Sequence, residues 1–171
     1  MPSSDLEELT DGVLALTPLR PADAEAHFAG EDAELIRWLN GGPGTLAGTR
    51  EYFQHCQEEW ASGGSLRAFG IRVNGVLAGT VDLRFSGEHL APGETNVAYG
   101  LYPQWRGHGF ATRAVLLAVQ YAASEGTRRA VIKAEPENVS SGAVARRAGF
   151  GLSGRVVEDG AVLDRYVLDL G

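Results

Sequence analysis

Apolar and polar residues alternate along much of the chain and divide it into strand-like and helix-like segments. Alternation predicts strands at 13–19, 68–73, 76–85, 95–102, 128–134, 151–158 and 162–168. Helical spacing predicts a helix opened by Pro21 and further helices at 33–39, 49–62, 107–124 and 138–148. This order predicts a mixed α/β (α+β) sheet, because a doubly wound fold would alternate strand and helix strictly.

Two dipeptides indicate hairpins between neighbouring strands. Asn74-Gly75 lies between the second and third predicted strands, and Asp159-Gly160 lies between the last two. Both pairs supply residues that tolerate the positive φ angles of a type I′ turn. The sequence therefore predicts antiparallel pairs near the front and at the back of the sheet.

The length of 171 residues favours one domain at 13–171, preceded by a loose tail at 1–12. No apolar run is long enough to cross a membrane, and the acidic N-terminus does not resemble a signal peptide. We therefore expect a cytoplasmic protein. Cys56 is the only cysteine, and the four histidines lack metal-ligand spacing, so we expect neither a disulfide nor a metal site.

Charge is unevenly distributed along this chain of net charge −7. Residues 1–35 carry nine acids against Arg20 alone, whereas residues 104–150 carry seven bases against three acids. An acidic chain is a poor general binder of nucleic acid. The basic stretch fits either a site for a small polyanion or a solvated surface.

The most informative segment runs from the end of one strand through a glycine-spaced loop into a long helix. Free N–H groups at a helix start bind anions, and Gly107 and Gly109 carry no side chain that would keep a phosphate away. Arg106 and Arg113 add positive charge nearby. A dinucleotide fingerprint fails because Thr112 replaces its third glycine, and a Walker loop is absent. A plain glycine turn remains an alternative.

Gln104-Trp105-Arg106-Gly107-His108-Gly109 fits the [Q/R]-x-x-G-x-[G/A] signature of the GNAT superfamily of N-acetyltransferases. Three further segments resemble the family in order: 98–103 its fourth strand, 110–114 the start of its helix, and 138–150 its "N-x-x-S … GF" segment. Residues 16–24 resemble its "L-R-P-x-D-A" start. The resemblance covers roughly residues 13–169 and is closest to the RimJ/RimL type, the ribosomal-protein alanine acetyltransferases.

The resemblance implies a GNAT fold and an acetyltransferase activity. The fold would be a mostly antiparallel sheet of about seven strands, splayed between the fourth strand at 95–102 and the fifth at 128–134, with about four flanking helices. The enzyme would move the acetyl group of acetyl-CoA onto a primary amine, either a protein N-terminus or a cationic small molecule, in a ternary complex. From the histidine spacing, the charge and the apolar runs we expect no metal, nucleic-acid or membrane partner, and the resemblance allows a homodimer.

The resemblance also assigns the cofactor site. Its residues are Tyr99, Gly100, Leu101, Gln104, Arg106, Gly107, His108, Gly109, Phe110, Ala111, Thr112, Asn138 and Ser141. The backbone of 99–101 would hold the pantetheine arm and the acetyl carbonyl, and the amides of 106–111 would hold the pyrophosphate. Arg146 and Arg147 are either contacts of the adenosine phosphate or ordinary exposed arginines.

The catalytic groups follow the family less closely. Asn96 stands where this branch often has a glutamate, so we expect Glu94, assisted by Asn96, to deprotonate the amine through water. Asp82 is the second candidate, and a solvent-facing acid is the alternative for either. The helix at 138–148 lacks the tyrosine that many GNAT enzymes use as an acid. Ser141 would hydrogen-bond the leaving sulfur, unless it serves only at a helix start that Asn138 or Ser140 caps.

The acceptor site would be built from residues 27–60 and 85–95. Its acids and aromatics suit a cationic amine: Glu31, Asp32, Glu34, Trp38, Glu51, Glu58, Glu59 and Trp60. A GNAT-fold sensor or interaction module that binds acyl-CoA without turnover is the alternative function. Transfer of an acyl group other than acetyl is a further alternative.

Overall fold

The computed structural model describes residues 8–40 and 44–171. The strands are β1 Leu9–Thr10, β2 Leu14–Pro18, β3 Leu66–Val73, β4 Val76–Arg84, β5 Glu94–Leu101, β6 Arg129–Ala134, β7 Gly151–Glu158 and β8 Ala161–Asp169. The helices are α1 Ala24–Gly30, α2 Ala33–Leu35, α3 Leu46–Ser62, α4 Phe110–Ser124 and α5 Val139–Arg147. Short helical turns are η1 Pro21–Asp23, the π-helix η2 Ile36–Asn40 and η3 Pro103–Trp105.

The strands form one sheet in the order β1-β2-β3-β4-β5-β6-β8-β7. Every neighbouring pair is antiparallel except β5 and β6, which are parallel. The mixed, mostly antiparallel sheet is therefore confirmed. The sheet has eight strands where about seven were expected. The additional strand is β1, which lies in the segment assigned to the tail and pairs with β2. Residues 1–7 of that segment lie outside the described residues.

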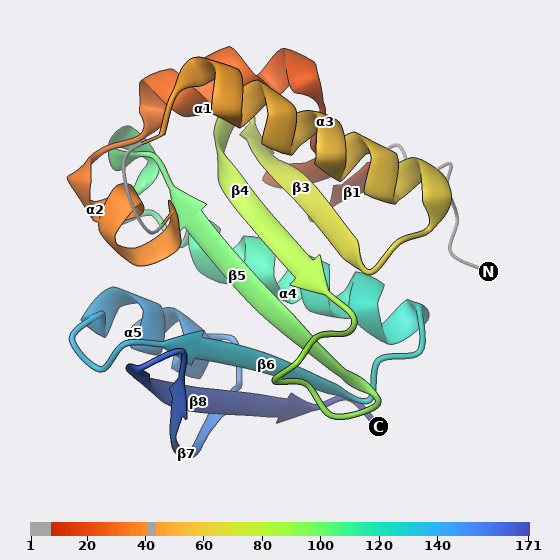
Figure 1. The fold of residues 1–171 in the computed structure, drawn as a ribbon, viewed down its shortest axis with the longest axis vertical. Helices are drawn as coiled ribbons and strands as arrows, with labels where there is room; N and C mark the ends of the chain where they lie inside the picture. The colour runs from red at the N-terminus through yellow and green to blue at the C-terminus, as the bar shows by residue number, and fades with distance from the viewer. Residues whose placement is uncertain (1–7, 41–43) are drawn as a thin grey trace.

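The parallel pair separates along its length, which confirms the predicted splay. β5 and β6 are paired only from Glu94–Arg129 to Asn96–Val131. Beyond Asn96 the two strands diverge, as Figure 1 shows. The carboxyl-terminal half of β5 therefore has a free edge that faces a gap in the sheet.

Helices cover both faces of the sheet (Figure 1). α1 and α3 lie on one face, over a small apolar core that contains Phe53 and Cys56. α4 and α5 lie on the other face, over the larger core that contains Phe69, Val115 and Phe150. No helix among the described residues is long and apolar enough to span a membrane.

The turn residues adopt the backbone angles that the sequence predicted. Asn74 and Gly75 have φ values of 51° and 77°, and Asp159 and Gly160 have values of 51° and 80°. β3 and β4, and likewise β7 and β8, are antiparallel neighbours joined by these turns. Both predicted hairpins are confirmed.

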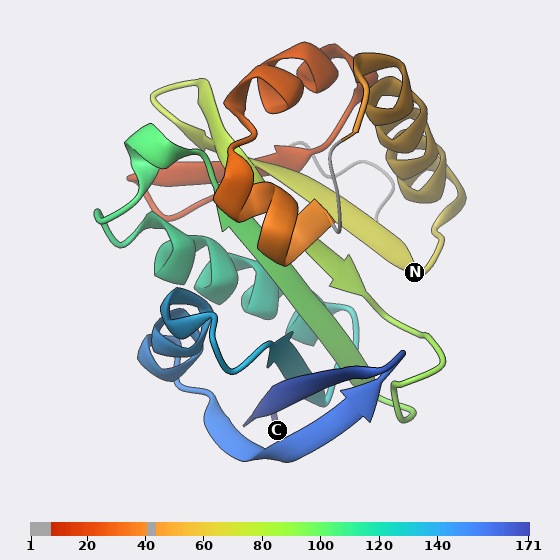
Figure 2. The ribbon, with the colours of Figure 1, turned by 60° about the vertical axis from the view of Figure 1, so that its left-hand side comes forward.

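A short helical segment crosses the front of β5. Figure 2 shows α2 and η2 in front of this strand, on the opposite side of the gap from α5. The approach is close, because a Cβ atom built on Gly100 would lie 2.4 Å from Leu35 Cδ2 and 3.1 Å from Leu39 Cδ2. Glycine at position 100 therefore lets α2 and η2 pack directly on the strand.

Candidate active site

A cavity of about 870 Å³ opens where β5 and β6 separate. Five parts of the chain form its walls. They are residues 97–101 of β5, residues 106, 107 and 109–112 of the loop and helix start, residues 132–135 with α5, the α2–η2 segment, and Ala161 and Leu163 of β8. Most of the predicted cofactor-binding residues line it: Tyr99, Gly100, Leu101, Arg106, Gly107, Gly109, Phe110, Ala111, Thr112, Asn138 and Ser141. Gln104 and His108 lie outside the lining.

The start of α4 presents a row of free backbone donors to this cavity. The first bond of the helix runs from Arg113 N to Gly109 O at 3.2 Å. The amides of residues 107–112 donate to no acceptor among the described residues. Gly107 and Gly109 both have φ of 79°, and a Cβ atom at either would meet nothing within 4 Å. These free amides are aligned at the N-terminus of α4, which is the positive end of the helix dipole, and they border open space. Together they form an anion-binding site, called the anion seat below, that fits a pyrophosphate.

The two arginines expected to add positive charge at this loop form ion pairs with carboxylates. Arg106 donates from Nη1 and Nη2 to both carboxylate oxygens of Asp32, at 2.7 and 2.9 Å, and its Nη1 lies 2.8 Å from Glu34. Arg113 pairs with Asp11 at 2.9 Å. The Arg106 amide also donates to the Pro103 carbonyl at 3.3 Å, so it is not a free donor. Both guanidinium groups are therefore ion-paired, and the free donors of the anion seat are glycine and helix amides.

The arginines of α5 differ in their surroundings. Arg147 lines the cavity. Arg146 lies with its guanidinium 5.5 Å from the centroid of the Tyr166 ring and 3.4 Å from the Tyr166 hydroxyl. Of the two candidates for an adenosine phosphate, only Arg147 faces the cavity.

Tyr99 connects the two sides of the strand gap. Its hydroxyl lies 2.9 Å from Ser141 Oγ and 2.9 Å from the Ser141 carbonyl oxygen. Asn138 caps α5 by accepting a bond from the Ser141 amide at 3.2 Å, which settles the choice between Asn138 and Ser140. Burial raises the pKa of Tyr99 to about 12, so the phenol stays neutral. Only the backbone of Tyr99 was expected to contribute, because the packing of α5 on this face of β5 is a tertiary feature that strand alternation does not indicate.

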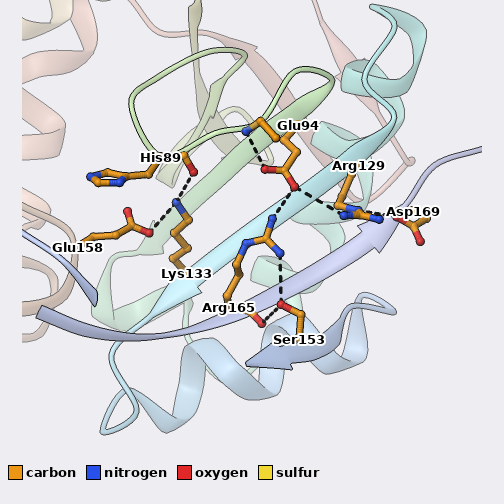
Figure 3. A network of polar contacts seen from close by, with 9 residues as sticks. His89, Glu94, Arg129, Lys133, Ser153, Glu158, Arg165 and Asp169 are labelled. Atoms are coloured by element: carbon orange, nitrogen blue, oxygen red, sulfur yellow. Dashed lines mark hydrogen bonds and ion pairs between the residues drawn. The ribbon is translucent and has the colours of Figure 1, made fainter. Parts of the chain in front are cut away.

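Glu94 lies in an ionic network at the paired end of β5 (Figure 3). Burial raises the pKa of its carboxyl group, but the Ala91 amide and the Arg165 guanidinium outweigh that effect and hold the pKa below its usual value. Arg129 approaches to 3.8 Å. Neither Glu94 nor Asn96 lines the cavity. The structure therefore places the favoured base and its assistant outside the cavity lining.

Asp82 has the environment of a near-neutral base. It lies on β4 directly opposite Ala98 of β5, which lines the cavity. The Tyr52 hydroxyl of α3 donates to its carboxylate at 3.4 Å. Burial is the largest influence and raises the pKa of Asp82 to about 6. Asp82 is also absent from the cavity lining, but it neighbours the lining residue Ala98 and has the more suitable pKa of the two candidates.

The acids and aromatics assigned to the acceptor site are largely dispersed. Glu34 and Trp38 line the cavity. Glu31 lies 3.1 Å from His27 Nε2, Glu59 accepts from the Leu66 amide, and Trp60 lies in the core. The apolar side chains of Leu35, Leu39 and Leu163 face the cavity instead, which the sequence analysis did not foresee. The described residues hold no group of three or more metal-ligating side chains.

Comparisons with known proteins agree with this geometry. A family model described as "Acetyltransferase (GNAT) domain" matches residues 14–151. A comparison with curated protein sequences finds no match. RimL, a ribosomal L7/L12 α-N-protein acetyltransferase solved with coenzyme A, has a TM-score of 0.82 at 21% identity, over 96% of this chain and 98% of that one.

Two further solved structures are similar. The aminoglycoside acetyltransferase AAC(6')-Ib with coenzyme A has a TM-score of 0.80 at 18% identity, over 91% of this chain and 94% of that one. Mycobacterium smegmatis RimJ with CoA-disulfide has a TM-score of 0.77 at 22% identity, over 92% and 82%. At these identities the likeness establishes a shared fold.

Proposed function

The chain belongs to the GNAT acetyltransferase family, and we propose that it transfers the acetyl group of acetyl-CoA directly to a primary amine in a ternary complex. The observation that carries this proposal is the row of free amides at 107–112, which opens into the cavity at the splayed strands. The similar structures of RimL and AAC(6')-Ib were both solved with coenzyme A, which supports the same donor here.

The donor would be held mainly by backbone groups. The amides of 107–112 would bind the pyrophosphate, and the free edge of β5 at 99–101 would bond the pantetheine arm and orient the acetyl carbonyl. Asn138 would contact the arm from the start of α5, and Arg147 would face the adenosine phosphate. Strand amides with no sheet partner can polarise a carbonyl without reorganising during the reaction.

The amine nitrogen would attack the thioester carbon, so that a C–N bond forms and the C–S bond breaks. The amine is mostly an ammonium ion at neutral pH, so the nitrogen loses one proton before it attacks and a second one afterwards. We assign acceptance of both to Asp82, through one water molecule, with the first passed on to solvent. A carboxylate with a pKa near 6 is mostly ionised at pH 7, and attack makes the N–H acidic enough for it to receive the proton. Glu94 is the weaker proposal, because Arg165 stabilises its ionised form.

The leaving sulfur would be stabilised by Ser141, with Tyr99 as a positioning residue. The phenol can donate to the Ser141 carbonyl and accept from Oγ, or it can donate to Oγ. The second arrangement frees the serine hydrogen to point at the sulfur, and it becomes favourable as negative charge develops there. The thiolate then takes its proton from water.

The finer assignments belong to the same proposal. We place the chain in the RimJ/RimL-like branch, supported by its motifs and by the fold shared with RimL and RimJ. A cytoplasmic location and a homodimer remain parts of the proposal. Gln104, His108 and Asn96 have no assigned contact in it.

An assay of CoA release tests the proposed activity. The enzyme is supplied with acetyl-CoA and a panel that contains a peptide with a free N-terminus, an alkylamine and an aminoglycoside. We expect CoA release that depends on an amine and matches an N-acetylated product identified by mass spectrometry. Binding of acetyl-CoA without any acetylated product would favour the sensor alternative.

A further inference from the structure

Two carboxylates lie at the start of the α2–η2 segment, Asp32 at the N-cap of α2 and Glu34 in its first turn, and both are already paired. Arg106 pairs with both carboxylates. It forms a bidentate pair with Asp32 and a third contact with Glu34. The Arg106 guanidinium, with the hydrogen bond that it donates, holds the pKa of Asp32 at about 2. Two-pronged arginine–carboxylate pairs are the strong, geometrically specific kind. A ligand cation would have to compete with this arginine for both acids.

The rest of this wall is apolar or positively charged. Leu35, Trp38 and Leu39 line the cavity from the α2–η2 side, and Leu163 lines it from β8. Arg37 also lines it, with its guanidinium 4.1 Å from the centroid of the Trp38 ring. Among the lining residues that the structure describes, the carboxylates are Glu34 and Glu135, and Glu135 follows β6 on the other side.

We infer that Arg106 determines acceptor specificity: by pairing with both Asp32 and Glu34 on a wall that also carries Arg37, it leaves no net negative charge there, favours a singly charged amine with an apolar substituent and disfavours polycations. The inference rests on the proposed function, since it names the acceptor class for that reaction. The single ammonium charge is lost when the nitrogen is deprotonated, and the apolar substituent gains from burial against the leucines and Trp38. On the α2–η2 wall a second ammonium group finds Asp32 and Glu34 already paired with Arg106, and it meets Arg37.

Arg106 is suited to this role by its place in the chain. It lies in the loop at the anion seat, while its side chain crosses to the wall opposite. Its Nε also donates to the Leu101 carbonyl at 3.1 Å, which fixes the guanidinium at the end of β5. The loop therefore contributes its amides to the donor side and its arginine to the acceptor side.

Hexylamine and hexamethylenediamine provide the test, because they share a six-carbon chain and differ by one amino group. Each is titrated calorimetrically into the complex of the enzyme with CoA, in which no acetyl group can be transferred. We expect the wild type to bind hexylamine roughly tenfold more tightly, which is about 1.4 kcal/mol. Tighter or equal binding of the diamine would overturn the inference.

Two variants of the same ion pair must shift the preference in opposite directions. Arg106→Gln frees both acids, so the preference for hexylamine should fall about tenfold. Asp32→Asn removes an acid but retains a side chain that can cap α2, as Asp32 does through the Leu35 amide, so the preference should rise. Arg113→Gln, which breaks the pair with Asp11, is the control and should leave the preference unchanged.

These readings separate the inference from the proposed function. General damage to the fold would weaken the binding of both amines together and leave the ratio of their affinities unchanged. A shift of both variants in the same direction, or no shift in either, would contradict the inference. Acetylation is measured separately with acetyl-CoA, so a lack of turnover would count against the proposed function while the binding preference still decides the acceptor class.

Discussion

The Tyr99 hydroxyl on β5 lies 2.9 Å from Ser141 Oγ on α5, across the gap where the parallel strands separate. The same hydroxyl bonds the Ser141 carbonyl at 2.9 Å. The helix that carries the serine is therefore fixed to the strand whose free edge would orient the thioester. This contact places a neutral phenol beside the Ser141 hydroxyl, near the carboxyl end of β5, where β5 and β6 are separated.

Tyr99→Phe should lower kcat about tenfold while changing the affinity for acetyl-CoA little, because a bond that strengthens only as charge develops acts on turnover. Ser141→Ala should lower kcat by at least as much. If Tyr99 acts through Ser141, the double variant should be no slower than Ser141→Ala alone. Steady-state kinetics on one accepted amine measure all three.

Tyr166→Phe serves as the control for loss of a buried phenol hydroxyl, since Tyr166 bonds Arg146 and not Ser141. It should change stability more than kcat. Additive effects of Tyr99→Phe and Ser141→Ala would show that the two act separately. A loss of thermal stability alone in Ser141→Ala would reduce the serine to a structural residue of the helix start.

Asp82→Asn should lower kcat/KM about a hundredfold near pH 7, within the usual range for loss of a general base. Wild-type activity should fall below pH 6, because burial raises the pKa of Asp82 to about 6 and the base is then protonated. The variant should lack this acidic limb, and its deficit should shrink at high pH, where more amine is free. A pH–rate profile of both enzymes makes the comparison.

Glu94→Gln is the matched comparison and should retain the acidic limb. If Glu94→Gln loses the limb and Asp82→Asn keeps it, the base is Glu94, and our assignment is wrong.

The ionised Asp82 carboxylate should also affect stability, in the opposite sense to a salt-bridged acid. Its raised pKa means that the folded state favours the protonated form, so wild-type stability relative to Asp82→Asn should fall as the pH rises from 4 to 6.

Glu94→Gln should instead destabilise the fold by about 2 kcal/mol at neutral pH, since the buried carboxylate compensates Arg165. The pKa of Glu94 is lowered in the folded state, so this stabilisation exists above the ordinary glutamate pKa and is lost as the pH falls through the folded value. Urea unfolding at pH 7 and near pH 3 should show a smaller difference between the two proteins in acid. An equal difference at both pH values would mean that packing, not charge, holds this site.

Local patterns predicted what local patterns determine. Alternation over 95–102 and the glycines at 107 and 109 sufficed to predict β5, the loop and a helix after it, because each depends on neighbouring residues, although α4 begins at Phe110 and not at Gly107. The turn at Asn74-Gly75 was predictable for the same reason. β1 was missed, since two residues carry no periodicity and pair only because β2 is present.

Side-chain roles that depend on distant partners were not predictable. Arg106 and Asp32 are far apart in sequence, and nothing local indicates that they meet. Glu94 and Asp82 both occur in strands, but their pKa values shift in opposite directions. The pKa of Glu94 is lowered beside Arg165, and the pKa of Asp82 is raised by burial beneath α3. The ordering of the two base candidates therefore required the tertiary structure.

Calorimetric binding of acetyl-CoA to Gly109→Val tests most directly whether the free amides hold the pyrophosphate. Gly126→Val is the matched control, because Gly126 also has a positive φ, of 97°, with open space at Cβ, but lies after α4 and outside the cavity lining. Acetyl-pantetheine, which lacks the pyrophosphate, is titrated in parallel. We expect Gly109→Val to bind acetyl-CoA at least about tenfold more weakly than Gly126→Val, with no such difference for acetyl-pantetheine. Equal affinity of the two variants for acetyl-CoA would contradict the assignment of the site.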